Sequence, residues 1–154
     1  MVYVFAFLIG ISAGLRTFTA PAVASWAARL GWLKLAGTPL AFLGSAVTPW
    51  VLTAAALFEL GADKSSWIQS RKAAPSFAGR IISGVLCGLA LASSGRAIPL
   101  GAAVAAIAGA VVGTLGGYEL RARLTQAAGG RGFPIALLED AITIGLAVCA
   151  VRSV

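Results

Sequence analysis

Long stretches of this chain contain no charged residue, and this feature restricts the folds open to it more than any other. Two of these stretches, residues 35–58 and 97–118, have the length of the ~20 residues that cross a membrane as a helix. Charged residues make up only 11% of the chain, whereas a soluble domain carries about 25%. The sequence therefore predicts an integral membrane protein.

The apolar segments predict one transmembrane domain over residues 1–154, of the all-α class. Short connectors leave no room for a separate soluble domain. Helices are expected because every backbone hydrogen bond must close within the membrane, and the segments lack the alternation of a β-barrel. We expect about five transmembrane helices, over residues 2–28, 39–61, 77–94, 98–118 and 133–151.

Basic residues predict the orientation. With five spans, seven bases lie on one side: Lys64, Arg71, Lys72, Arg80, Arg121, Arg123 and Arg131. Four lie on the other side: Arg29, Lys34, Arg96 and Arg152. The positive-inside rule then predicts a cytoplasmic N-terminus and an external C-terminus. In this setting the net charge of +7 indicates membrane lipids as partners and gives no reason to expect nucleic acid.

Two pairs of segments resemble each other faintly. "GISAGLRTF" in the first segment is similar to "GAVVGTLGGYEL" in the fourth, and "AALFEL" in the second is similar to "IALLED" in the fifth. A repeat offset by three spans runs through the membrane in the opposite sense. The pattern therefore predicts the inverted repeat found in many transporters.

Arg16 is the most informative residue of the first segment. It lies about 20 Å along a helix that starts near Val2, where a charge is costly unless it faces protein or water. Gly14 and Pro21 predict that the helix is broken near Arg16. Thr17 or Thr19 would then cap a second half-helix. This geometry would aim backbone N–H groups and a guanidinium at one point, which suits an anion.

Arg16 has an alternative, structural role, in which it pairs with a buried carboxylate and holds two segments together. Glu59, Glu139 and Asp140 are carboxylates placed within or at the ends of apolar segments, where an unpaired charge is costly. Any of the three is a candidate partner for Arg16, and the two roles are compatible if the pair opens to admit a ligand. A carboxylate of this set would serve as a gate or proton carrier.

Several classes of function are disfavoured by missing residue types. The chain has no histidine, and no cofactor motif, catalytic residue or metal site is predicted. Every lysine lies in a connector, so no Ser–Lys pair is expected inside the membrane and we expect no enzyme. Cys87 and Cys149 lie in apolar segments and are expected to be small hydrophobic residues rather than a disulfide.

Glycines recur at four-residue spacing on single helix faces. Gly10 and Gly14 form one such face, and Gly109 and Gly113 form another. Such faces let helices approach closely in lipid. They indicate either packing within one chain or a homodimer contact, and a dimer is expected because five short helices enclose little volume.

The motifs "GISAGLRTF", "FELGADK", "GRIISG" and "GGYELRARL…ALLEDAI" resemble a bacterial family of membrane proteins described as domain of unknown function 4126. The likeness spans nearly the whole chain. It implies a membrane bundle, which we expect in a bacterial inner membrane, and it singles out Arg16, Glu59, Asp63, Glu139 and Asp140. It implies no substrate.

Two functions remain open at this point. The first is a small transporter or channel for an anionic solute or a lipid phosphate, which would bind at Arg16, Thr17, Thr19, Glu59, Glu139 and Asp140. The second is a non-transporting scaffold or anionic-lipid-binding protein. Its active surface would be a lipid-facing basic set: Arg71, Lys72, Arg121 and Arg123.

Overall fold

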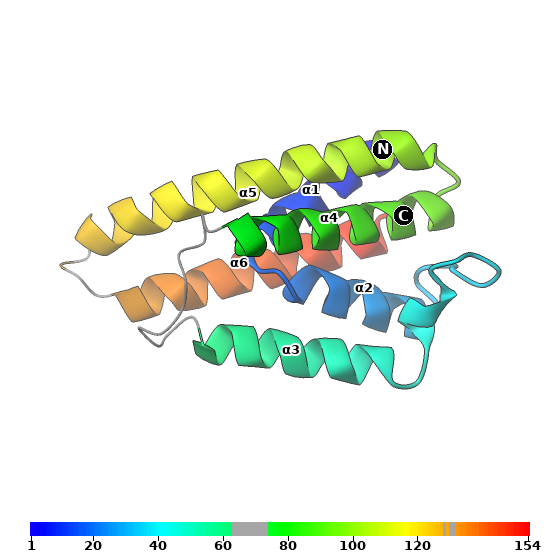
Figure 1. Cartoon of the computed structure of the whole chain (residues 1–154), viewed down its shortest axis with the longest axis horizontal. Coiled ribbons are helices and arrows are strands. Elements are labelled where there is room, and N and C mark those ends of the chain that lie inside the picture. The colour runs from blue at the N-terminus through cyan, green and yellow to red at the C-terminus, as the bar shows by residue number, and fades with distance from the viewer. Residues whose placement is uncertain (63–73, 128, 130–131) are drawn as a thin grey trace.

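The protein is a bundle of helices in the computed structural model, which describes residues 1–62, 74–127, 129 and 132–154. Six α-helices and one 3₁₀ helix, with no strand, are present in these residues (Figure 1). The α-helices are α1 Val2–Leu15, α2 Thr19–Arg29, α3 Thr48–Ala62, α4 Ala74–Ser94, α5 Pro99–Ala127 and α6 Gly132–Arg152, and η1 is Ala41–Gly44. The predicted all-α class is confirmed.

Three helices are long and apolar enough to cross a membrane, by length and composition. They cover Pro75–Ser94, Pro99–Ala127 and Phe133–Arg152 within the part of the chain that the structure describes. The third and fifth predicted segments match α4 and α6 closely, and α5 continues past the predicted end at residue 118 to Ala127. The second predicted segment starts too early, because residues 39–47 form turns and η1 before α3 begins.

The first predicted segment is broken near Arg16, as expected, but it does not cross the bundle. Helix α2 runs back alongside the bundle in the opposite direction to α1 (Figure 1). Val2 lies against Gly95, and the Lys34 N–H donates to the Ser94 hydroxyl at 3.1 Å. The start of α1 and the connector after α2 therefore lie at the same end of the bundle. Residues 2–29 form a helical hairpin.

This hairpin changes the placement of the chain termini. Val2 and Val154 both lie against Gly95, so the two termini share one end of the bundle (Figure 1). The prediction of termini on opposite sides is wrong. The reason is that the first apolar segment enters and leaves the bundle at the same end.

Helices α1 and α5 pack in parallel at very short range. A Cβ added at Gly10 would overlap the backbone of Ala106, and one at Gly113 would overlap the backbone of Ile11. Residue numbers rise together along both helices, from Tyr3 beside Gly101 onward. These glycine faces therefore serve packing within the chain. An inverted repeat would require α1 and α5 to run in opposite directions, so the parallel pair contradicts the predicted repeat.

The distribution of side-chain sizes agrees with a membrane setting. Small residues dominate the buried interior, as Ala6, Ala13 and Ala20 illustrate with no exposed surface. Large apolar residues face outward, and Phe58 and Leu100 are 78% and 73% exposed. A soluble protein rarely exposes extended apolar surface, whereas small residues at helix contacts are typical of membrane bundles. Both cysteines are free, Cys87 buried and Cys149 exposed.

Candidate functional site

The turn of the helical hairpin forms the centre of the candidate site. Helix α1 ends at Leu15, Arg16 is extended at φ −139° and ψ 122°, and α2 begins at Thr19. We call residues 14–18 the hairpin tip. A helix end leaves backbone carbonyls or N–H groups without an intrahelical partner. The hairpin tip therefore presents buried acceptors from the end of α1 and partly exposed donors at the start of α2.

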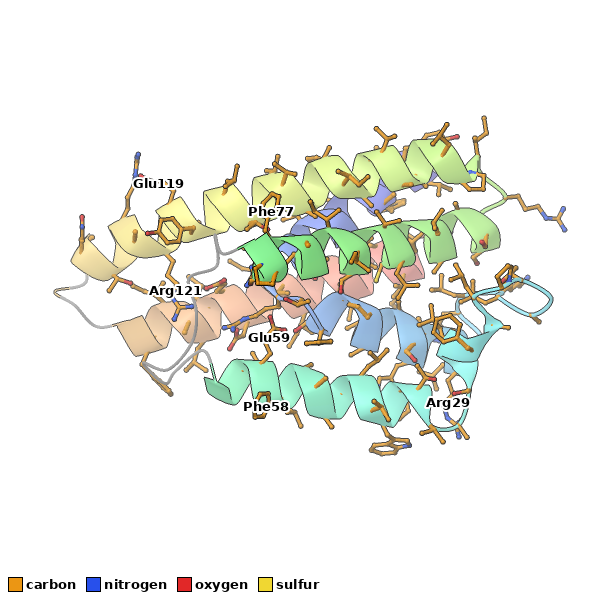
Figure 2. All side chains as sticks on the ribbon, in the orientation of Figure 1. Arg29, Phe58, Glu59, Phe77, Glu119 and Arg121 are labelled. Carbon is orange, nitrogen blue, oxygen red and sulfur yellow. The ribbon has the colours of Figure 1, made fainter. Side chains whose placement is uncertain are left out.

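The donors at the start of α2 are bound by Glu59 of α3. The Thr17 N–H donates to Glu59 Oε1 at 2.8 Å and the Phe18 N–H donates to Oε2 at 2.9 Å. Figure 2 shows the Glu59 side chain directed from α3 toward this region, while Phe58 points away. A carboxylate is favourable at this position because the helix dipole leaves partial positive charge at an N-terminus.

The predicted side-chain cap by Thr17 or Thr19 is wrong. Phe18 occupies the N-cap position of α2, and no side-chain cap hydrogen bond is formed there. Thr17 contributes its backbone N–H, and Thr19 is the first residue of α2 and is buried. Glu59 replaces the hydroxyl cap because both of its oxygens reach the backbone donors at once.

The acceptors at the end of α1 are bound by α4 and α5. Arg80 Nη1 donates to the carbonyl of Gly14 and, at 3.1 Å, to the carbonyl of Leu15. The Thr114 hydroxyl of α5 lies 3.1 Å from the same Gly14 carbonyl. A guanidinium is favourable here because the C-terminus of a helix carries partial negative charge. Arg80 and Thr114 thus stabilise the broken end of α1.

Arg16 forms an ion pair with Asp140 of α6. The distance between Nη2 and Oδ1 is 2.5 Å, and the two side chains are only 2% and 12% exposed. At a rise of 1.5 Å per residue, Asp140 lies about 12 Å from the start of α6 and about 18 Å from its end. The pair therefore lies inside the bundle, far from either end of α6. Asp140 is one of the three partners expected for Arg16.

A second ion pair lies beside the first. Arg121 Nη1 of α5 is 3.3 Å from Glu139 Oε2 of α6, and Figure 2 shows Arg121 directed from α5 toward α6. The side chain of Glu139 is only 9% exposed. Since Glu139 precedes Asp140 directly, the two pairs join α1, α5 and α6 into one charged cluster.

The structure unites most of the predicted binding residues and separates the basic set. Glu59 and Asp140 contact the hairpin tip, which contains Arg16. Glu139 lies next to Asp140 in α6 and pairs with Arg121. Arg123 instead pairs with Glu119 at 2.9 Å on the exposed face of α5. Residues outside the described part of the chain include two members of the basic set and one acid: Arg71, Lys72 and Asp63.

The sequence did not assign Arg80 and Thr114 to the candidate site. Arg80 counts among the seven bases of one membrane side, although it lies three residues inside the predicted segment 77–94. A second arginine within an apolar segment is the same signal that identified Arg16. Thr114 carries a weaker signal, as a hydroxyl among the small residues of an apolar helix.

The hairpin tip is thus bound by a polar side chain from each of four helices: Glu59 of α3, Arg80 of α4, Thr114 of α5 and Asp140 of α6. Cations and carboxylates balance there, and no three His, Cys, Asp or Glu side chains gather at a potential metal site among the described residues. The backbone donors of the hairpin tip are occupied by the Glu59 carboxylate, and the Arg16 guanidinium is paired with Asp140.

The fold and this centre define the class of helical membrane bundles with an interrupted, charge-bearing helix. The chain belongs to the family described as a domain of unknown function, DUF4126, whose family model matches residues 4–153. This finding confirms the resemblance noted in the sequence. No curated protein and no solved structure matches the chain.

Proposed function

We propose that the protein is a small membrane transporter or channel for an anionic solute or a lipid phosphate. One observation carries this proposal: the buried Arg16–Asp140 pair lies at an interrupted helix inside an apolar bundle. A charged pair in such a place costs desolvation energy that a continuous apolar helix would avoid. Charges retained inside membrane bundles are typical of substrate and ion pathways.

Glu59 indicates where the anion would bind. Its carboxylate receives the N–H groups of Thr17 and Phe18 at 2.8 and 2.9 Å, which is the position that an external anion would take at a helix start. In this mechanism Glu59 acts as the gate. When its carboxylate moves away or takes up a proton, the two N–H groups and the Arg16 guanidinium become the binding site.

The proposed topology follows from the shared end of the termini. The connector after α2, Arg96 and Arg152 lie at this end, and it carries four bases of the sequence: Arg29, Lys34, Arg96 and Arg152. Arg121 and Arg123 lie in the last turns of α5, and the sequence between α3 and α4 and between α5 and α6 adds Lys64, Arg71, Lys72 and Arg131. The positive-inside rule then places both termini outside a bacterial inner membrane. The α1–α2 hairpin would enter from outside, and α3 to α6 would cross, in a homodimer.

Anion flux from liposomes tests the proposal. Liposomes that contain the purified protein are loaded with chloride, nitrate or phosphate. They should release at least one of these anions, as measured with ion-selective electrodes. Arg16→Ala should abolish the release, and Glu59→Gln should change its rate because the gate loses its charge. Glu119→Gln, on the exposed face of α5, is the matched control. Flux that is unchanged in folded Arg16→Ala protein would exclude Arg16 from the mechanism.

The second candidate is a scaffold or anionic-lipid-binding protein without transport. The Arg16–Asp140 contact at 2.5 Å favours it, since a closed ion pair also fits a purely structural tie between α1 and α6. Liposomes that stay impermeable to every tested anion, with salt-sensitive binding to anionic lipid, would support this candidate instead.

A further inference from the structure

A groove of ≈ 100 Å³ lies between the last turns of α5 and the first turns of α6. Its polar lining residues are the ion-paired Arg121 and Glu139. The rest of the lining is Gly117 and a set of branched aliphatic side chains: Leu15, Leu120, Leu124, Ile135, Leu138 and Ile142. The groove is therefore apolar with one charged pair in its wall.

The groove has a defined depth along α5. Arg121 lies about 33 Å along this helix from Pro99, and the hydrocarbon core of a bilayer is about 30 Å thick. With Pro99 taken as one boundary of the hydrocarbon, Arg121 lies at the other boundary, next to the headgroups. Leu15 and Ile142 lie deeper, at the level of the hairpin tip. The groove accordingly runs from the headgroup boundary into the hydrocarbon.

We propose that this groove binds one anionic glycerophospholipid, with its phosphate at Arg121 and an acyl chain along the aliphatic lining. In a membrane, acyl chains would surround this part of α5 and α6, and they would match the apolar lining of the groove in polarity. The Arg121 side chain is 26% exposed, so its guanidinium can meet a phosphate at the groove mouth.

The lipid would contact the charged cluster from one side. Leu15 and Glu139 both line the groove, and they directly precede Arg16 and Asp140 in the sequence. A bound acyl chain would therefore exclude water from the flank of the Arg16–Asp140 pair. This inference requires only that α5 and α6 lie in a membrane, and it holds whether or not the protein transports an anion.

Native mass spectrometry of the purified full chain tests the inference. The probes are phosphatidylglycerol and phosphatidylcholine with identical acyl chains. We expect the wild type to retain about ten-fold more phosphatidylglycerol, and Arg121→Ala to lose this preference. Arg121→Lys should keep most of the preference for phosphatidylglycerol. Leu138→Trp, which fills the groove, should lower retention of both lipids. Arg123→Ala, on the same helix but outside the lining, is the matched control and should change retention less than two-fold.

Three outcomes would overturn the inference. One is an unchanged preference in Arg121→Ala, and another is unchanged retention in Leu138→Trp. The third is displacement of the lipid by inorganic phosphate at the same concentration, which would show that the groove contributes nothing to binding. Leu138→Trp keeps the Arg121–Glu139 pair in place, so the inference stays testable if Arg121→Ala does not fold.

Discussion

Nη2 of Arg16 lies 2.5 Å from Oδ1 of Asp140, although the two residues belong to opposite ends of the chain. Both side chains are almost completely buried, so each charge depends on the other for stabilisation. This pair joins the hairpin tip to α6, so its loss should lower the stability of the fold.

Asp140→Asn should destabilise the protein by about 3–5 kcal/mol, because it leaves the Arg16 charge buried without its carboxylate partner. Arg16→Gln combined with Asp140→Asn should cost much less than the sum of the single changes. The free energy of unfolding in mixed micelles, followed by tryptophan fluorescence, measures both effects. Glu119→Gln breaks an exposed pair and should cost at most ~0.5 kcal/mol. Equal costs for Asp140→Asn and Glu119→Gln would contradict the prediction.

Glu59→Ala should loosen the start of α2. The substitution removes the acceptor of the Thr17 and Phe18 N–H groups, and a lost helix cap costs about 0.5–2 kcal/mol. Amide hydrogen exchange of a peptide that covers residues 12–20 should become faster by about ten-fold. Glu119→Ala should leave this peptide unchanged. Exchange that stays slow in Glu59→Ala would mean that the carboxylate does not stabilise the hairpin tip.

Two glycines of α5 should respond oppositely to alanine. A methyl group at Gly113 would overlap the Ile11 backbone, whereas nothing lies within 4 Å of a Cβ at Gly116. Gly113→Ala should therefore destabilise the protein by about 1–3 kcal/mol. Gly116→Ala should be neutral or stabilise it by up to ~1 kcal/mol, since alanine favours a helix. Equal stability of the two variants would exclude the close α1–α5 approach.

Labelling should find both termini on the same side of the membrane. In a Cys149→Ala background, Ser153→Cys and an N-terminal tag should be accessible from one side. Arg123→Cys, which replaces a 75% exposed side chain, should be accessible only from the other. Membrane-impermeant maleimide and protease, applied to intact spheroplasts and to inverted vesicles, make this measurement. Modification of the two termini from opposite sides would contradict the hairpin.

Much of the fold follows from the sequence because apolar length and helix breakers act locally. The helical class, the ends of α4 and α6, and the break near Arg16 depend on residues close together in the chain. The reversal of α2 is different. A run of about 27 apolar residues has the hydropathy of a crossing helix, and what turns it back is contact with Glu59, Arg80 and Asp140, which are remote in sequence.

The candidate site was predictable in its residue types and less so in its pairing. Arg16 and the carboxylates stand out because charges inside apolar segments are costly. In the sequence alone, Glu59, Glu139 and Asp140 are equivalent candidate partners for Arg16. The selection of Asp140 for Arg16 and of Glu59 for the α2 backbone depends on how the helices are rotated about their axes. That rotation depends on packing between helices that are remote in sequence, which only the packed structure reveals.

The long-range ties of the hairpin tip bear on biogenesis. The ribosome delivers Arg16 to the translocon first, whereas Asp140 emerges with the last helix. Until then the nascent hairpin carries a guanidinium whose carboxylate has not been made, so its stable entry into the bilayer should await the completed chain. A truncation that ends before α6 should leave residues 2–29 open to proteases.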